Sequence, residues 1–298
     1  MDALGSFRNS QTLDAMLLSG GVEFKGGYLL IEISRRSFIL GSALALLSYS
    51  LLEVNFLLVK KYTILVKGLS PAFDGFTILH LSDLHNKEFG HKQEKLLNLI
   101  NKQEFHLVAI TGDLVDKRNP RVMPGIHLVE KLSHKPVYFV PGNHDWWNGF
   151  KFREQLIESG VKILENQAEK FSLNGEHFWV VGVDDPYLGR DNLGQALLNV
   201  NDAAPKILLA HAPNIYDAAI KSGIDLVMVG HTHGGQVRLP ILGAIVIPGQ
   251  DLFPKLDYGL FTSGKTSMII NGGLGESVLP IRFNMKPEIV LLTLRTDQ

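Results

Sequence analysis

The sequence predicts an α/β fold, and two observations lead to this prediction. First, five short apolar, β-rich runs end abruptly in Asp, Asn or His, usually with Gly or Pro nearby. Second, polar amphipathic stretches lie between several of these runs. Strands of this kind are buried when helices cover both faces of a sheet or when two sheets pack together. The five predicted strands lie in Phe76–Asp83, Phe105–Asp113, Val137–Asp145, Lys206–Pro213 and Asp225–His233.

The remaining elements follow from the stretches between and after these strands. The predicted helices are Gln93–Gln103, Arg121–Leu132, Phe152–Ser159 and Ile215–Lys221. Hairpin-like strands are predicted at Lys170–Asn174, His177–Val183, Gln236–Arg238, Thr266–Asn271 and Glu288–Thr293. In α/β proteins, polar residues at strand ends carry the chemistry, so the strand ends are the place to look for a site.

Composition excludes several classes of protein. The 298 residues are 45% hydrophobic, which excludes global disorder. The 29 basic and 30 acidic residues leave a net charge of -1, so we expect no affinity for nucleic acid. The chain has no Cys, which excludes disulfides, a thiolate zinc site and a cysteine nucleophile. Any metal must therefore be held by His, carboxylate or amide groups.

The N-terminal part divides into two zones. Residues 1–33 show no sustained periodicity and form an extension, and we expect the true start codon to lie later. In residues 34–59, Ser34 and the pair Arg35-Arg36 precede an almost unbroken apolar run. This pattern predicts an export signal or a membrane anchor, with membrane association through residues 38–59. The arginine pair resembles a twin-arginine signal and predicts use of that export machinery. A buried core helix is the alternative.

Eight polar residues gather at the predicted strand ends. Two Asp, one Asn and several His, without Cys, suit a site for Mn, Fe or Zn. In the D-x-H and H-x-H patterns, residues i and i+2 project to the same side of an extended chain, so both can face one ion. The eight are Asp83, His85, Asp113, Asn143, His144, His211, His231 and His233.

The motifs around these residues resemble the calcineurin-like metallophosphoesterase superfamily. The matching segments, in order, are SDLH (82–85), GDLVD (112–116), GNHD (142–145), AHAP (210–213) and GHTHGGQ (230–236). The resemblance covers residues 60–298 and implies a metallophosphoesterase domain there. It implies a four-layer β-sandwich in which two mixed sheets are flanked by helices.

The resemblance also implies a role for each residue. Asp83, His85 and His233 would hold one divalent ion, and Asn143, His211 and His231 a second. Asp113 would bridge the two ions. His144 would protonate the leaving oxygen as a group titrating near neutrality, with Asp145 orienting it. Two further candidates for substrate contact are Asp185 and Arg190, although a turn ending in proline explains their segment equally well.

The implied activity is hydrolysis of a phosphomonoester or phosphodiester by a hydroxide that two metal ions activate. Two alternatives stay open: a pyrophosphatase of a nucleotide-linked lipid or sugar, of the UDP-diacylglucosamine type, and a non-catalytic, metal-containing envelope binding protein. The segments FDGFTILHLSDLH, VGVDDP and HTHGGQVRLPILG resemble one bacterial branch of the superfamily. That branch implies a phosphorylated small-molecule, lipid or envelope substrate. It also implies a location at the outer face of the cytoplasmic membrane or in the cell wall.

Overall fold

The computed structural model describes residues 21–25, 28–32, 34–244, 247, 254–277 and 279–297. The chain forms two compact units, Met1–Leu52 and Glu53–Gln298. In the first unit, β1 (Gly21–Lys25) pairs antiparallel with β2 (Tyr28–Glu32). The sequence did not predict this pair, because the segment lacks a clear strand periodicity. The other residues of the predicted 1–33 extension lie outside the described residues.

Helix α2 (Arg35–Glu53) follows, and it includes the arginine pair and the apolar run. The Ser34 hydroxyl accepts a hydrogen bond from the backbone N–H of Ser37 at 3.1 Å, so Ser34 caps the helix. Large apolar side chains such as Phe38 and Leu40 are exposed. Among the described helices, none is both long enough and apolar enough to cross a bilayer. The signal or anchor at residues 34–59 stays a prediction.

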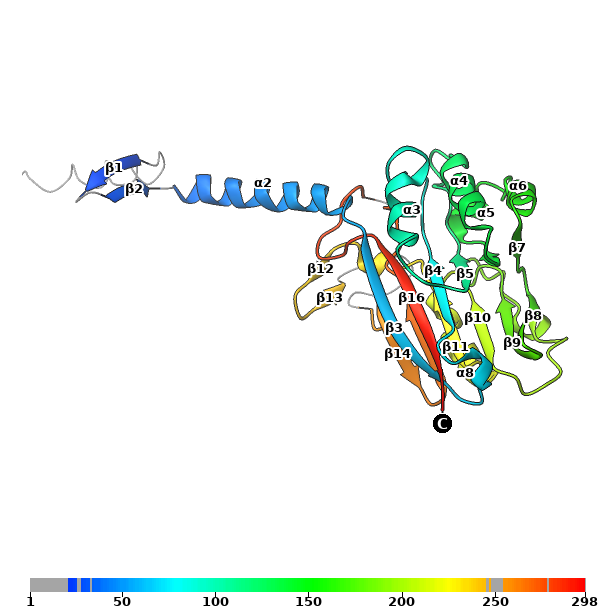
Figure 1. Ribbon diagram of the computed structural model, residues 1–298. Coiled ribbons are helices and arrows are strands. Elements are labelled where there is room, and N and C mark those ends of the chain that lie inside the picture. The colour runs from blue at the N-terminus through cyan, green and yellow to red at the C-terminus, as the bar shows by residue number, and fades with distance from the viewer. Residues whose placement is uncertain are drawn as a thin grey trace, which may run out of the picture. The chain divides into compact units, whose positions relative to one another are not determined.

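The second unit contains a mixed six-stranded sheet in the order β3-β16-β4-β5-β6-β7 (Figure 1). Its neighbouring strands run parallel except β16 and β4, which are antiparallel. The bounds are β3 (Leu58–Val66), β16 (Glu288–Thr296), β4 (Thr77–Leu81), β5 (Leu107–Thr111), β6 (Val137–Val140) and β7 (Val161–Ile163).

A second six-stranded sheet has the order β14-β15-β11-β10-β9-β8. The pairs β15·β11, β11·β10 and β10·β9 are parallel, whereas the edge pairs β14·β15 and β8·β9 are antiparallel. The bounds are β14 (Gly259–Ser263), β15 (Thr266–Ile270), β11 (Leu226–Val229), β10 (Lys206–Leu209), β9 (Glu176–Gly182) and β8 (Gln167–Leu173). A short pair, β12 (Arg238–Leu239) and β13 (Gly243–Ala244), lies outside both sheets.

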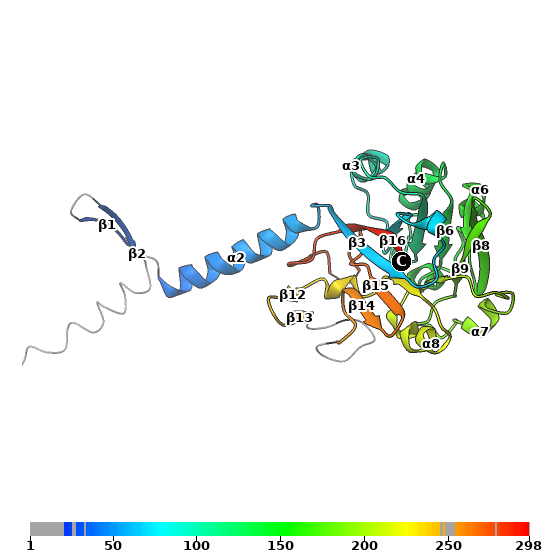
Figure 2. The ribbon, with the colours of Figure 1, turned by 60° about the horizontal axis from the view of Figure 1, so that its bottom comes forward.

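Three apolar clusters hold the sheets and helices of the second unit together. One lies between the sheets and joins side chains such as Ile78 and Phe178. A second packs α3 (Glu94–Ile100), α4 (Met123–Leu132) and α6 (Arg153–Glu158) on the first sheet. A third packs α7 (Leu193–Ala196) and α8 (Tyr216–Lys221) on the other sheet. Figure 2 shows these helix groups on opposite sides of the strands. The predicted mixed α/β fold with two sheets and covering helices is confirmed.

Most predicted elements are present within a few residues of their expected bounds, with two exceptions. The run Glu288–Thr293 is not half of a hairpin, because β16 lies between β3 and β4 in the first sheet. The run Gln236–Arg238 is replaced by the two-residue strand β12. The pairing of β16 depends on distant segments, which local sequence pattern does not specify, whereas β12 forms a short hairpin with the next strand, β13.

Candidate metal centre

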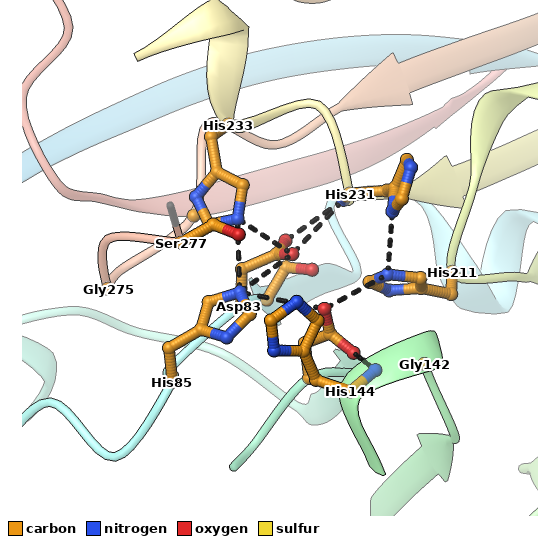
Figure 3. A network of polar contacts seen from close by, with 12 residues as sticks. Asp83, His85, Gly142, His144, His211, His231, His233, Gly275 and Ser277 are labelled. Atoms are coloured by element: carbon orange, nitrogen blue, oxygen red, sulfur yellow. Dashed lines mark hydrogen bonds and ion pairs between the residues drawn. The ribbon is translucent and has the colours of Figure 1, made fainter. Parts of the chain in front are cut away.

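Five strands deliver the predicted site residues to one edge of the molecule. In the first sheet, β4, β5 and β6 are parallel, and in the second, β10 and β11 are parallel. The carboxyl ends of parallel strands meet at one edge of a sheet, so the loops that follow them converge. Figure 3 shows imidazoles and carboxylates from both sheets pointing toward one another. The tertiary structure therefore brings together residues up to 150 positions apart, such as Asp83 and His233.

The first group of candidate ligands consists of Asp83, His85 and His233. The two imidazole Nε2 atoms are 3.0 Å apart. Asp83 Oδ1 lies 3.8 Å from Nε2 of His85 and 3.4 Å from Nε2 of His233. Burial lowers the pKa of His233 well below its usual value, so its imidazole is neutral and free to donate a lone pair.

A second group surrounds the Nε2 atom of His211. Asn143 Oδ1 is 2.9 Å from this nitrogen, His231 Nδ1 is 3.1 Å away, and Asp113 Oδ2 is 3.3 Å away. Burial lowers the pKa of His231 to about 4, which also leaves that ring neutral. The group contains the three residues that the resemblance implies for the second ion, together with Asp113, the implied bridge.

Asp113 connects the two groups. Its Oδ2 atom lies 3.5 Å from His85 Nε2 in the first group, as well as 3.3 Å from His211 in the second. Its Oδ1 atom accepts a hydrogen bond from the backbone N–H of His144 at 2.8 Å. This bond fixes the carboxylate so that Oδ2 faces both groups.

The donor atoms fit a metal site. Three sets of carboxylate and imidazole atoms lie close enough together to hold an ion: Asp83/His85/His233, His85/Asp113/His144 and Asp83/Asp113/His211. Asp83 and Asp113 are at most 2% exposed, and buried carboxylates need a compensating positive charge. In the protein alone, burial lowers the pKa of His211, but the carboxylates of Asp113, Asp83 and Asp185 together outweigh burial and raise it well above its usual value. A metal cation can replace that proton.

The backbone at these positions is unusual. Asp83, Asp113 and His231 have φ angles of 52°, 54° and 68°, and His85 and His233 are also in the left-handed region. Non-glycine residues rarely adopt this conformation, and such strain clusters at functional sites. Gly112 has φ +87°, and a Cβ atom there would lie 2.7 Å from His211 Nδ1. Only glycine lets the loop after β5 approach His211 this closely.

His144 is the second residue of the short helix α5 (Asn143–Trp147), beside both groups. Its Nδ1 atom accepts a hydrogen bond from the backbone N–H of Lys117 at 3.1 Å. A neutral ring therefore carries its proton on Nε2. Burial lowers the pKa of His144 to about 4, below the near-neutral titration expected from the sequence. An anionic phosphate beside the ring would raise this pKa again, because it favours the imidazolium.

Asp145 acts differently from the expectation. Its Oδ2 atom accepts hydrogen bonds from the backbone N–H groups of Asp113 at 2.8 Å and Gly142 at 2.9 Å. None of the hydrogen bonds found among the described residues joins its carboxylate to the His144 imidazole. Asp145 therefore holds together the two loops that carry Asp113 and His144, and it orients His144 only through the backbone.

The two predicted substrate contacts lie outside the cavity. A cavity of about 240 Å³ is lined by Asp113, Asn143, His144, His231 and His233, together with other residues. Neither Asp185 nor Arg190 lines it. The guanidinium of Arg190 stacks 3.7 Å above the Trp146 ring and donates from Nε to Asp184 at 2.9 Å. Asp185 is fully buried and accepts the backbone N–H of Tyr187 at 3.0 Å.

Residues that sequence reasoning missed line the cavity instead. They include Lys117, Trp147 and Tyr187. Lys117 directly follows the GDLVD motif, and Trp147 lies two residues after GNHD. Their closeness to the motifs was the sequence signal that could have identified them as cavity residues. Tyr187 lies in the VGVDDPYLGR segment, next to the residues that were predicted.

Comparison with known proteins identifies the family. A family model described as calcineurin-like phosphoesterase matches residues 76–235, which include the motifs up to His233. The chain belongs to the calcineurin-like phosphoesterase family. Members of this family depend on metal ions, in agreement with the candidate ligand groups.

Several members of this phosphoesterase family are similar over most of the chain. The uncharacterized metallophosphoesterase YkuE of Bacillus subtilis is 28% identical over 288 residues, covering 89% of this chain and 99% of YkuE. Phosphodiesterase YaeI of Escherichia coli is 29% identical over 233 residues, covering 74% of this chain and 82% of YaeI. Among solved structures, TT1561 of Thermus thermophilus has a TM-score of 0.46 at 16% identity, covering 67% of this chain and 90% of that one.

Proposed function

We propose that this chain hydrolyses phosphomonoester or phosphodiester bonds with two divalent metal ions. The observation that carries the proposal is the position of Asp113 Oδ2, 3.5 Å from His85 Nε2 and 3.3 Å from His211 Nε2. One carboxylate oxygen thus faces both groups of ligands. A shared carboxylate offsets the repulsion between two nearby cations, so this geometry supports a binuclear site.

Each ion would have its own set of ligands. Asp83, His85 and His233 would hold one ion, and Asn143, His211 and His231 the other, with Asp113 between them. Neutral imidazole, amide and carboxylate ligands suit Mn, Fe or Zn. When bound, such ions lower the pKa of water and neutralise the phosphate oxygens in the transition state.

His144 would supply the proton that the leaving oxygen needs. It lines the cavity, and the bond from Lys117 to Nδ1 keeps the ring proton on Nε2. The T-shaped packing of its ring against His85, with centroids 4.5 Å apart, limits rotation. Asp145 would maintain the distance between Asp113 and His144 through its two backbone contacts.

Metal analysis of the purified protein, combined with a screen of phosphate esters, tests this proposal. We expect about two ions per chain and turnover of an activated diester such as bis(4-nitrophenyl) phosphate. Removal of the ions with a chelator should abolish turnover, and adding Mn, Fe or Zn should restore it. A protein that binds metal but hydrolyses no ester would instead be a metal-containing binding protein, and the proposal would be wrong.

We further propose that the protein is exported or anchored at the outer face of the cytoplasmic membrane. The arginine pair at the start of α2 and the exposed apolar side chains that follow it support this location. A phosphorylated lipid or envelope precursor would be an accessible substrate there.

A further inference from the structure

A buried carboxylate connects the helix that carries His144 to a loop of the other sheet. Asp184 follows β9 in the second sheet and is only 5% exposed. Its Oδ1 atom accepts a hydrogen bond from the indole Nε1–H of Trp146 at 2.6 Å. Trp146 lies two residues after His144 in α5, which follows β6 of the first sheet. The bond between Asp184 and Trp146 therefore joins loops from both sheets.

The Asp184 side chain is itself held in place by the rest of its loop. Its Oδ2 atom accepts a charge-assisted hydrogen bond from Arg190 Nε at 2.9 Å, and the Arg190 guanidinium stacks 3.7 Å above the Trp146 ring. The side chain of Asn166 accepts the backbone N–H of Asp184 and donates to the carbonyl of Arg190, both at 3.1 Å. The indole thus lies between a carboxylate and a cation that belong to one fixed loop.

Helix α5 depends on such contacts because it is only five residues long. A single helical turn has little stability of its own. At its start, the Asp145 carboxylate accepts two backbone N–H groups, and near its end Trp146 donates to Asp184. His144 lies between these two supports, so the direction of its ring depends on both.

We infer that Asp184 is a positioning residue for the proton donor: through Trp146 it holds α5 so that the His144 ring keeps its place in the cavity wall. This inference rests on the proposed function, in which His144 protonates the leaving oxygen. Asp184 does not line the cavity, so it acts through Trp146 and not on the substrate. Arg190 contributes by fixing the Asp184 carboxylate and covering the indole.

Two diesters with different leaving groups test the inference. The leaving group of bis(4-nitrophenyl) phosphate departs with little need of a proton, whereas that of diphenyl phosphate is more basic and needs one. The ratio of kcat/KM for diphenyl phosphate to that for bis(4-nitrophenyl) phosphate cancels any loss of folded or metal-loaded protein. We expect Asp184→Ala to lower this ratio about tenfold, because a displaced proton donor loses part of its contribution.

Three further variants show whether the effect passes through the indole and His144. Trp146→Phe should lower the ratio by a similar factor, because the ring stays but its N–H is lost. Asp184→Asn should keep the ratio within about threefold of the wild type, because the amide oxygen still accepts from Trp146. In a His144→Ala background, Asp184→Ala should change the ratio no further, because the donor is already absent.

Asp202 offers a matched control. It also accepts an indole N–H, from Trp179 Nε1 at 2.8 Å, and it pairs at 3.1 Å with Lys170, whose ammonium lies 4.9 Å from the Trp179 ring centroid. These partners belong to β8 and β9 and not to α5. Asp202→Ala therefore loses the same kinds of contact and should leave the ratio at the wild-type value.

The outcomes separate this inference from the proposed function. Equal losses for both substrates in Asp184→Ala, or a further fall of the ratio in the His144→Ala background, would overturn the inference alone. If His144→Ala left the ratio unchanged, or the wild type cleaved only the nitrophenyl ester, His144 would not be the proton donor and the inference would fail with that role. A metal-loaded wild type that cleaves neither diester nor any monoester would overturn the whole proposed function.

Discussion

Asp113 is the residue on which the two ligand groups depend, because its Oδ2 atom faces both. We predict that Asp113→Asn lowers phosphodiester hydrolysis by at least about 10³-fold and reduces the bound metal, because an amide cannot balance two cations. Turnover and metal content of the purified variant measure this. Asp217→Asn, at an exposed position on α8, is the control and should match the wild type. Full metal content with full activity would show that Asp113 does not bridge.

The geometry around His144 allows two roles, metal ligand or proton donor. His144 lies close enough to His85 and Asp113 to be a ligand, yet its Nδ1 atom is taken by Lys117. We predict that His144→Ala lowers turnover by about 10²–10⁴-fold, the usual contribution of a general acid, while the metal content stays at the wild-type level. Metal analysis beside the kinetic assay decides the point. If the variant lost an ion, His144 would be a ligand rather than the proton donor.

At the scale of elements, the loop after β15 supports the first ligand group. The backbone N–H of Leu274 donates to Ser82 at 3.0 Å, and that of Gly275 donates to Asp83 at 2.6 Å. Arg282, which is fully buried, fastens this loop by donating to the carbonyls of Gly272 and Gly273 at 2.9 and 3.2 Å. A distant arginine thereby fixes the backbone at Asp83.

We predict that Arg282→Met lowers the free energy of unfolding by about 3 kcal/mol, because several buried carbonyls lose their donor. The same variant should bind metal more weakly, since the loop behind Asp83 loosens. Denaturant unfolding and metal titration measure the two effects. Arg295→Met is the matched control, because that arginine is half-exposed and pairs with Asp74. Equal stability of the two variants would contradict this role for Arg282.

Local sequence pattern predicts individual strands and helices well, but it does not predict which strands pair in a sheet. The runs ending at Asp83, Asp113 and His233 are predicted as strands because apolar β-rich sequence and a polar end are local features. The partners of β16 were not predicted, because its pairing with β3 joins segments from the two ends of the domain. The same limit applies to Arg282, whose sequence neighbours give no sign of burial.

At the scale of the whole molecule, the arginine pair in α2 tests the proposed location. We predict that replacing Arg35-Arg36 by Lys-Lys blocks export, because a twin-arginine signal requires the guanidinium pair and not only its charge. Cell fractionation followed by an activity assay of each fraction measures the effect. Replacing Lys60-Lys61 by Arg-Arg, in β3, is the control and should leave the distribution as in the wild type. Unchanged export of the Lys-Lys variant would refute the twin-arginine route.

The sequence by itself determined the family, the strand-end positions of the ligands and the absence of thiolate chemistry, because each depends on residue types at short spacing. The family resemblance already implied that Asp113 lies between two ions. The tertiary structure alone decided that Asp145 holds two loops together and that Arg190 stacks on Trp146 instead of lining the cavity. These relations join side chains from different strands and loops. Their distances depend on how two sheets pack, and no local sequence pattern encodes that packing.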